Sequence, residues 1–518
     1  MPCRNGSPQR KAPAQRIRQN ARTPAVSPPA GSSMQHHPRL VPLIVACALF
    51  MENLDSTVIA TSLPAIAADI GANPLALKLA VTSYLLSLAV FIPASGWTAD
   101  RFGARRVFAA AIFVFMLGSI GCAFANSLEG FVVARIVQGI GGAMMTPVGR
   151  LVLVRTIEKR ELVSAMAWVT IPALIGPVVG PPVGGFITTY ASWHWIFLIN
   201  IPIGIVGIVL VLIYIDPLPA EHQEPFDATG MLLAGAGVAG LAFGLSVAGL
   251  DILPWQIVVA LVAGGATAMT AYLFHAKTVP APILDFSLLR FATFRASVVG
   301  GFMFRLGIGA LPFLLPLMLQ TGFNMSPFQS GLVTFAGALG AIGMKTVAAR
   351  TIKRFGFRRV LIVNALLSAV LIAAIAIFRP GMPVSVLILI LLVGGFFRAL
   401  EFTAVNTIAY AEIEERRMSR ATALASVGQQ LSISAGVAVG ALMVELSLTF
   451  RGADTFTAAD FTPAFLVVAA ISAASALWFW RLPADAGAEM SGRSPANAEA
   501  EPNAEPIAAA ETSDRRMG

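Results

Sequence analysis

Residues 100–107 read Asp-Arg-Phe-Gly-Ala-Arg-Arg-Val, and residues 353–360 read Lys-Arg-Phe-Gly-Phe-Arg-Arg-Val. Each copy of this motif follows the second apolar segment of its half of the chain and opens the third. At the same spacing of 253 residues, Glu52 in the first apolar segment corresponds to Arg305 in the ninth. Matching motifs at matching places predict that the chain is built from two related halves.

The segments around the two motif copies are long and apolar. Of the 518 residues, 56% are hydrophobic and only 12% are charged, whereas a soluble domain carries about 25% charged residues. Apolar windows between charged or Pro/Gly breaks predict fourteen helices, each of roughly the length that spans a hydrocarbon core. Their approximate limits are 40–66, 78–98, 107–126, 129–150, 163–190, 196–215, 228–248, 254–275, 295–319, 327–348, 359–378, 384–410, 420–448 and 463–481.

The chain is therefore expected to be an all-α polytopic membrane protein with 14 transmembrane helices. Two six-helix bundles, residues 40–215 and 295–482, flank two inserted transmembrane helices and their linkers in residues 216–294. The polar tails, residues 1–39 (basic) and 483–518, contain too little apolar surface to fold and are predicted to be disordered.

The basic residues indicate the orientation of the chain. With the N-terminus placed in the cytoplasm, thirty Lys and Arg residues fall on the cytoplasmic side and three fall outside. The remaining three, Arg135, Arg305 and Arg398, lie inside the spans. Because Lys and Arg concentrate in cytoplasmic loops, both termini are expected there. This bias accounts for the net charge of +9 without a nucleic-acid partner.

Ionisable side chains inside apolar spans are costly to bury and are therefore the candidate functional residues. Glu52 and Asp55 are three residues apart in the first span, and so lie on one helical face. A carboxyl group balanced between burial, which favours its neutral form, and a nearby cation, which favours its charged form, can bind and release a proton. Arg135 in the fourth span is the expected partner of Asp55. The pair is predicted to couple proton binding to movement; a purely structural ion pair is the alternative.

The second half carries its own charged side chains. Arg305 could pair with Glu52 or bind an anionic group of a substrate. Arg398 and Glu401 are three apart in the twelfth span, where they either satisfy one another or face the substrate. Polar residues also bridge helices in lipid, so each is a weak signal alone. The predicted substrate-cavity residues are Gln138, Arg305, Arg398, Glu401 and Asn406.

Several longer motifs follow one another on the spans in order. Residues 96–106 resemble the loop signature of the major facilitator superfamily, and residues 135–139 resemble its fourth-span arginine motif. Residues 176–185, Gly-Pro-Val-Val-Gly-Pro-Pro-Val-Gly-Gly, look like its antiporter motif. Residues 54–64 and 193–204 are similar to motifs of the fourteen-span drug:proton antiporter branch, the multidrug efflux type. The resemblance covers the whole apolar part of the chain.

This resemblance implies the major-facilitator fold and further site residues. The implied gating residues at the cytoplasmic side are Asp100, Gly103 and Arg105. Proline bends a helix and glycine lets backbones approach closely, which suits a helix between two moving halves. The antiporter-motif residues are Gly176, Pro177, Gly180, Pro181, Gly184 and Gly185. The second motif copy departs from the first, with Lys353 where Asp100 stands.

We therefore expect a proton-coupled secondary transporter that exports amphipathic small molecules or drugs from the cytoplasm by alternating access. The alternatives are a proton-coupled importer of a metabolite or organic anion and, less favoured, a polytopic membrane enzyme. No Gly-x-x-x-x-Gly-Lys-Ser/Thr phosphate loop occurs, so the proton gradient, without a cofactor, is the expected energy source. No histidine has metal-ligand spacing, and no metal site is expected.

The expected location is the bacterial inner (plasma) membrane, as a multi-pass protein. The expected partners are a small-molecule substrate and the lipid bilayer, with no nucleic acid. A periplasmic adaptor protein is left open, and we expect a monomer.

Overall fold

The computed structural model describes residues 40–157, 162–217, 226–247, 253–280, 282–414, 417–453 and 455–491, without the side chains of residues 162–174, 490 and 491. The predicted N-terminal tail lies outside these residues, as does the predicted C-terminal tail from residue 492 onward. Its first part is described and ends in a short helix, α18 (Ala488–Ser491). All regular elements of the described residues are helices, which confirms the predicted all-α class.

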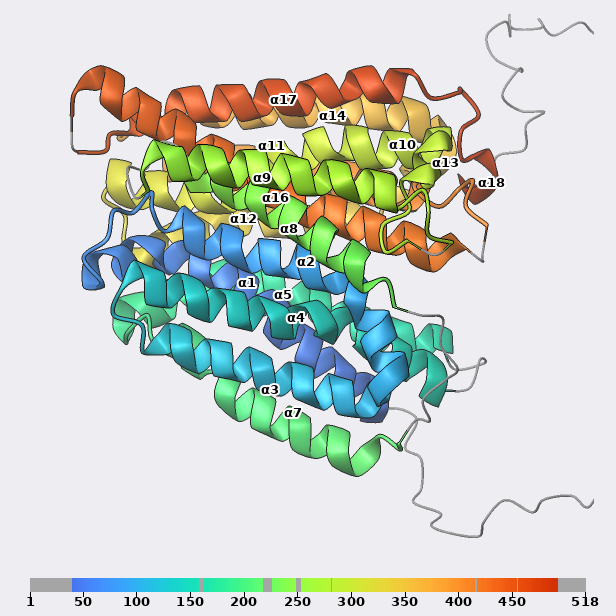
Figure 1. The fold of residues 1–518 in the computed structure, drawn as a ribbon. Helices are drawn as coiled ribbons and strands as arrows, with labels where there is room; N and C mark the ends of the chain where they lie inside the picture. Colours follow the sequence, from blue (N-terminus) through green and yellow to red (C-terminus); the bar gives the residue numbers. More distant parts are fainter. Residues whose placement is uncertain are drawn as a thin grey trace, which may run out of the picture. The chain divides into compact units, whose positions relative to one another are not determined.

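The first half forms one helical bundle. α1 packs against α4, α5 and α7, α3 packs against α4 and α7, and α2 packs against α4 (Figure 1). The sixth predicted span is broken into α6 and α7 near Ile199. The helices are α1 (Leu40–Asp69), α2 (Lys78–Phe102), α3 (Ala104–Ala123), α4 (Leu128–Thr156), α5 (Leu162–Tyr190), α6 (Trp195–Leu198) and α7 (Asn200–Tyr214).

The second half forms a bundle with the same order of spans. α11 packs against α16 and α17, α12 packs against α15, and α14 packs against α15 and α17. The elements are η1 (Phe286–Arg290), α10 (Ala292–Arg295), η2 (Ala296–Gly300), α11 (Gly301–Leu317), η3 (Met318–Gly322), α12 (Pro327–Lys345), α13 (Ala348–Phe355), α14 (Phe357–Ile375), α15 (Val384–Ile408), α16 (Met418–Arg451), η5 (Ala458–Phe461) and α17 (Thr462–Trp480).

The two motif copies adopt the same turn. Gly103 separates α2 from α3 with φ +87°, and Gly356 separates α13 from α14 with φ +77°. Side chains other than glycine rarely adopt these angles, so the repeated glycine is required by the backbone. The copies differ upstream, because α12 and α13 meet at a 59° bend whereas α2 runs unbroken into its glycine.

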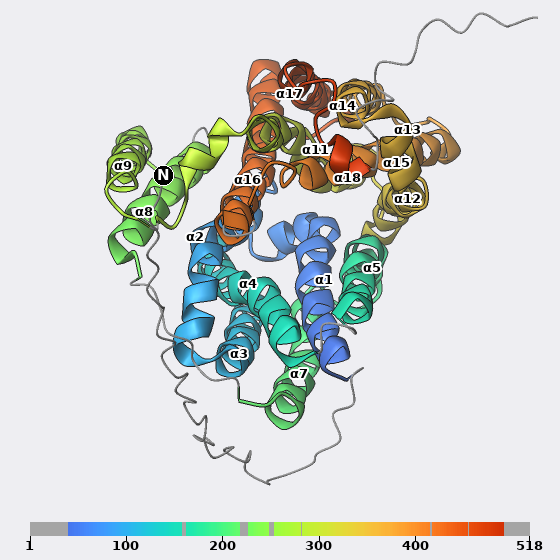
Figure 2. The ribbon, with the colours of Figure 1, turned by 90° about the vertical axis from the view of Figure 1, so that its right-hand side faces the viewer.

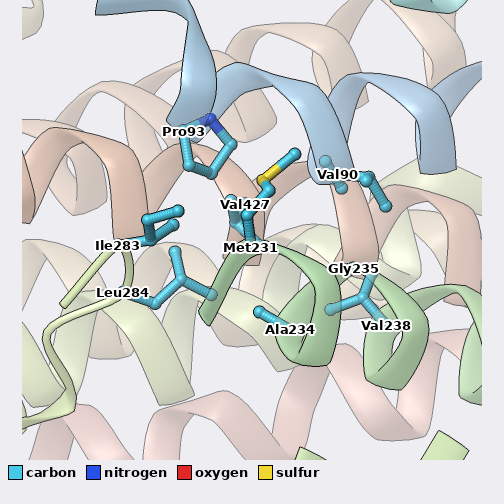
Figure 3. A pocket seen from close by; sticks show the side chains of 10 residues that line it. Val90, Pro93, Met231, Ala234, Gly235, Val238, Ile283, Leu284 and Val427 are labelled. Atoms are coloured by element: carbon cyan, nitrogen blue, oxygen red, sulfur yellow. The ribbon is translucent and has the colours of Figure 1, made fainter. Parts of the chain in front are cut away.

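Two inserted helices lie beside the bundles. α8 (Ala228–Val247) packs against α2, α16 and α9 (Trp255–His275), as Figure 2 shows. Glycine allows the close approach of α8 and α9, since a Cβ on Gly240 would lie 2.8 Å from the Gly265 Cα. The small hollow where α8 meets α2 and α16 is lined only by apolar side chains and Gly235 (Figure 3). No side chain that lines it carries a polar group, and we interpret it as a gap left by the packing of these helices.

The bundle has the polarity of a protein that lies in lipid. Twelve of the described helices, or thirteen if the bent pair α12 and α13 is one span, are long and apolar enough to cross a membrane. This count does not include the 29-residue α5, and the predicted fourteen is close but not confirmed. Phe450 is 89% exposed whereas Arg135 is 1% exposed, the reverse of a water-soluble protein. The chain is a multi-pass membrane protein.

The two halves contact one another through several pairs of helices. We call the two ends the Leu40 end, where α1 begins, and the Asp69 end, where α1 finishes. Contacts between the halves run from α5 to α12, from α2 to α16, and from α1 to α11 and α12. At the Asp69 end, Gln320 Nε2 donates to the Thr61 carbonyl at 2.8 Å, and the Phe328 N–H donates to Thr189 Oγ1 at 3.1 Å.

Candidate functional site

A buried ion pair joins the first and fourth spans of the first half. Arg135 Nη1 on α4 lies 2.8 Å from Asp55 Oδ2 on α1, and each side chain is 1% exposed. The structure thus places these predicted partners in direct contact. Each charge compensates the other in a region where an isolated charge would be very costly.

Three further polar side chains complete the hydrogen bonding of this pair. Asp55 Oδ1 accepts from Gln138 Nε2 at 2.8 Å and from Asn200 Nδ2 at 2.9 Å. Gln138 Oε1 accepts from Arg135 at 2.6 Å, and Ser119 Oγ accepts from Gln138 at 2.8 Å. Four helices, α1, α3, α4 and α7, therefore contribute to one network. The predicted cavity residue Gln138 is fully buried within it.

The rest of the Arg135 guanidinium is enclosed by α2. Its Nε donates to the Ala80 carbonyl at 3.3 Å, and its Cζ lies 4.3 Å from the ring centroid of Tyr84. Backbone carbonyls and aromatic faces both favour a cation. Arg135 is therefore held on several sides, and a change in the charge of Asp55 would act on α1, α2 and α4 together.

Glu52, the second carboxyl of α1, has quite different surroundings. Its Oε2 accepts from Thr146 Oγ1 on α4 at 2.8 Å, and it is half-buried. No ion pair with Glu52 occurs among the described residues. The suggested pairing of Glu52 with Arg305 is absent, because Arg305 is bound within its own bundle. The two carboxyls thus differ: one is paired with a cation, and the other has a neutral partner.

The predicted charged site residues of the second half, Arg305, Arg398 and Glu401, lie on α11 and α15. Arg305 Nη2 donates to Asn406 Oδ1 at 2.7 Å, and its Cζ lies 5.7 Å from the ring centroid of Phe402. Arg398 and Glu401 do not satisfy one another, because the structure has no hydrogen bond or ion pair between them. Arg398 Nη1 and both carboxyl oxygens of Glu401 are buried without a hydrogen-bond partner.

The antiporter-motif glycines on α5 serve two different contacts. A Cβ on Gly176 would lie 3.1 Å from the Asn53 Cβ on α1, and a Cβ on Gly184 would strike the Val58 carbonyl oxygen. Gly180 likewise lies against Thr57 of α1. Gly185 faces the other half, where an added Cβ would strike the Pro327 carbonyl oxygen of α12. The motif therefore packs α5 within its bundle and also against the second bundle.

Pro177 and Pro181 fall in the same stretch of α5. The Pro181 carbonyl oxygen faces α12, because a Cβ on Gly331 would collide with it. Close approach of α5 and α12 thus depends on glycine in both helices.

The predicted gating residues lie at the Leu40 end. Asp100 Oδ1 at the end of α2 accepts from Arg155 Nη2 of α4 at 2.8 Å. Arg105 at the start of α3 donates to the carbonyl oxygen of Leu212 on α7. Both contacts stay within the first half. In this conformation, Asp100 is paired within its own bundle.

Comparison with known proteins decides the family. A model of the Major Facilitator Superfamily matches residues 45–301 and 297–507. The chain belongs to the Major Facilitator Superfamily. It is 40% identical over 451 residues to the "Putative multidrug resistance protein MdtD" of Salmonella typhimurium and of Salmonella typhi. The matched region covers 86% of this chain and 95% of each relative. The resemblance inferred from the motifs, including the multidrug efflux type, is confirmed.

Solved structures agree on the major-facilitator fold. A D-xylose-proton symporter matches with a TM-score of 0.61 at 16% identity, covering 86% of this chain and 98% of that one. The human organic anion transporter MFSD10 (TETRAN) matches with a TM-score of 0.56 at 16% identity, covering 86% of this chain and 100% of that one. At these identities the similarity shows the fold alone.

Sequence reasoning missed two members of this superfamily protein's buried network, Asn200 and Ser119. Asn200 lies inside the motif of residues 193–204, which was assigned to a branch but not to a role. It begins α7 directly after the break at Ile199, and this break turns it toward Asp55. A polar residue at an interruption of an apolar span was the available signal.

An ion pair between the halves gives a testable prediction. Lys78 Nζ on α2, fully buried, lies 3.9 Å from Glu445 Oε2 on α16 at the Asp69 end. Because Glu445 is 22% exposed, the pair is expected to contribute about 1 kcal/mol to closure of this end. Lys78→Gln should raise about fivefold the rate at which a cysteine introduced at Thr61 reacts with a polar thiol reagent. Lys277→Gln is the control. An unchanged reaction rate for Lys78→Gln would exclude a role of this ion pair in closing the Asp69 end.

Proposed function

We propose that this protein exports amphipathic small molecules, including drugs, in exchange for protons by alternating access. The observation that supports this most strongly is the buried centre around Asp55 and Arg135. A functional role explains a charged network inside lipid-spanning helices better than packing does, because replacing such groups with apolar ones is often neutral or stabilising. The multidrug resistance name of the relatives supports the class of substrate.

Protonation of Asp55 is the proposed coupling step. A proton on the carboxylate removes the charge that holds Arg135, and the guanidinium keeps only its contacts to α2 and to Gln138. The attraction between α1 and α4 then weakens, and the helices can change their relative position. Glu52, half-buried and hydrogen-bonded to Thr146, lies one helical turn nearer the Leu40 end and is proposed to pass the proton from Asp55 toward the cytoplasm.

The contacts between the halves support the proposed cycle. They include hydrogen bonds and an ion pair at the Asp69 end, so this conformation is joined there. We propose that the protein lies in the bacterial inner membrane with its Leu40 end and both termini on the cytoplasmic side. Basic residues concentrate at the Leu40 end, as they do in the cytoplasmic loops of membrane proteins. The structure then corresponds to a state closed to the outside. Asp100 is proposed to close the opposite end when the halves rock.

The protein is proposed to act as a transporter and to catalyse no chemical reaction. The relatives and structural neighbours are named as transporters or as a resistance protein. The substrate crosses the membrane unchanged in this scheme, and no cofactor takes part.

Energised inverted vesicles provide the direct test. Vesicles containing the protein are expected to accumulate a fluorescent amphipathic cation when respiration makes their interior acidic, and to release it when a protonophore is added. Vesicles without the protein are the control. Accumulation that survives the protonophore would rule out proton coupling, and loss of dye from preloaded energised vesicles would favour an importer.

A further inference from the structure

Glu401 stands apart from the other charged groups in the spans. It lies on α15, two turns before the end of that helix at Ile408, and is 0% exposed. Both of its carboxyl oxygens are buried, and neither has a hydrogen-bond partner. Asp55 in the first half has three hydrogen-bond donors around a similarly buried carboxyl. The two buried carboxyls therefore differ in hydrogen bonding: Asp55 has donors on both oxygens, and Glu401 has none.

The charged groups around Glu401 are few. α15 packs against α11, η2, α12, α13 and α14, and of these elements α11 supplies Arg305, whose field acts on Glu401. Arg305 nevertheless bonds Asn406, and its Nε has no partner. Arg398 on α15 itself turns toward Gly394 and toward Gly337 of α12. The other cationic side chains of these elements lie at the end of α12, on α13 and at the start of α14: Lys345, Arg350, Lys353, Arg354, Arg358 and Arg359.

Burial without hydrogen bonds determines which form of the carboxyl is stable. An isolated ionised carboxylate in a low-dielectric interior costs several kcal/mol even after relaxation, and a neutral acid costs far less. On α14, which packs against α15, the buried Asn364 Nδ2 and Ser368 Oγ also have no hydrogen-bond partner. Nothing around Glu401 in the described residues replaces the water that an ionised group would lose.

We propose that Glu401 carries a proton in this conformation and is a second proton-binding site of the transport cycle, located in the C-terminal half. This rests on the proposed antiport function and extends it. When the Leu40 end opens further and cytoplasmic water reaches Glu401, its O–H bond breaks and the proton passes to that water. The carboxylate that remains pairs with Arg305, which leaves Asn406. Each cycle thereby exchanges at least two protons, one through Asp55 and one through Glu401.

Infrared spectroscopy of the purified protein tests the protonation state without any substrate. The wild-type spectrum at neutral pH minus that of Glu401→Gln should contain the carbonyl-stretch band of a protonated carboxylic acid. Glu414→Gln is the matched control: Glu414 is exposed, and its replacement should leave that band unchanged. A difference spectrum for Glu401→Gln that lacks this band and shows a lost carboxylate band instead would overturn the proposal. If Glu401→Gln does not fold, Glu401→Asp should shift the band rather than remove it, and an unmoved band would overturn the proposal equally.

Proton stoichiometry tests the role in transport. In proteoliposomes, the pH gradient that just balances a known gradient of the dye gives the number of protons exchanged per dye molecule. Glu401→Gln should lower that number by one while dye transport continues, whereas Glu414→Gln should leave it unchanged. An unchanged number for Glu401→Gln would refute the second site. A wild-type protein that moves dye without protons would instead refute the proposed function, whatever the infrared result.

Discussion

Asp55→Asn is expected to abolish proton-driven export while the protein remains folded and inserted. The amide oxygen can still accept from Arg135 at the place of Asp55 Oδ2. The amide nitrogen replaces Oδ1, so the hydrogen bonds from Gln138 and Asn200 are lost while the side-chain shape is kept. Asparagine has no ionisable proton, however, and Arg135 can no longer respond to a change of charge on α1. Growth inhibition by a panel of amphipathic compounds, in a host without its own exporters, should equal that of cells lacking the transporter.

Two further variants separate coupling from structure. Asp55→Ala removes the partner of a buried cation and is expected to cost about 3–5 kcal/mol of stability, seen as a loss of folded protein in the membrane fraction. Asp485→Asn makes the same chemical change at an exposed position and should leave both export and yield unchanged. Normal proton-driven resistance in Asp55→Asn would refute the coupling role of this carboxyl.

Gly185→Ala is expected to reduce export strongly, for a different reason. Its new Cβ would collide with the Pro327 carbonyl oxygen of α12, which belongs to the backbone and cannot rotate away. The halves must then separate at the Asp69 end. Overpacking of this kind costs about 1–3 kcal/mol, which disfavours the closed state roughly 5- to 150-fold. Export falls because each cycle must pass through that state. Gly331→Ala, which meets the Pro181 carbonyl oxygen, should have the same effect.

Cross-linking measures this separation directly. The rings of Tyr190 and Phe328 lie 5.8 Å apart across the two halves, so cysteines placed there should be joined by a short bifunctional thiol reagent. Gly185→Ala should lower the yield of that cross-link. Gly264→Ala on α9 is the control, because its added Cβ meets no atom within 4 Å. Full export together with full cross-linking in Gly185→Ala would contradict the assigned contact.

Several features of the site followed from residue type and spacing alone. Arg135 was paired with Asp55 because opposite charges in lipid seek one another, and the structure has that contact. The repeated Arg-Phe-Gly motif predicted two related halves, and the glycines of both copies have positive φ. These features are local or depend on a strong two-body attraction, so they can be inferred without knowing how the helices pack.

Other features required knowledge of helix rotation. Arg398 and Glu401 are three residues apart, which favours mutual pairing, yet Arg398 turns toward Gly394 and Gly337. Glu52 and Arg305 occupy equivalent places in the repeat, yet each is bonded within its own bundle. Pairing rules for one helix or one repeat do not include neighbouring helices, which offer these long side chains other partners.

Apolar length, the bias of basic residues and the repeated motif were enough to establish a two-part bundle of membrane helices, since the cost of burying charge and unpaired backbone in lipid leaves few other arrangements. The folded arrangement alone decided which buried carboxyl received a cation and which received none, and which glycine of α5 faces α12. Those outcomes depend on the rotation and depth of each helix against its neighbours, and contacts among residues far apart in the chain set both.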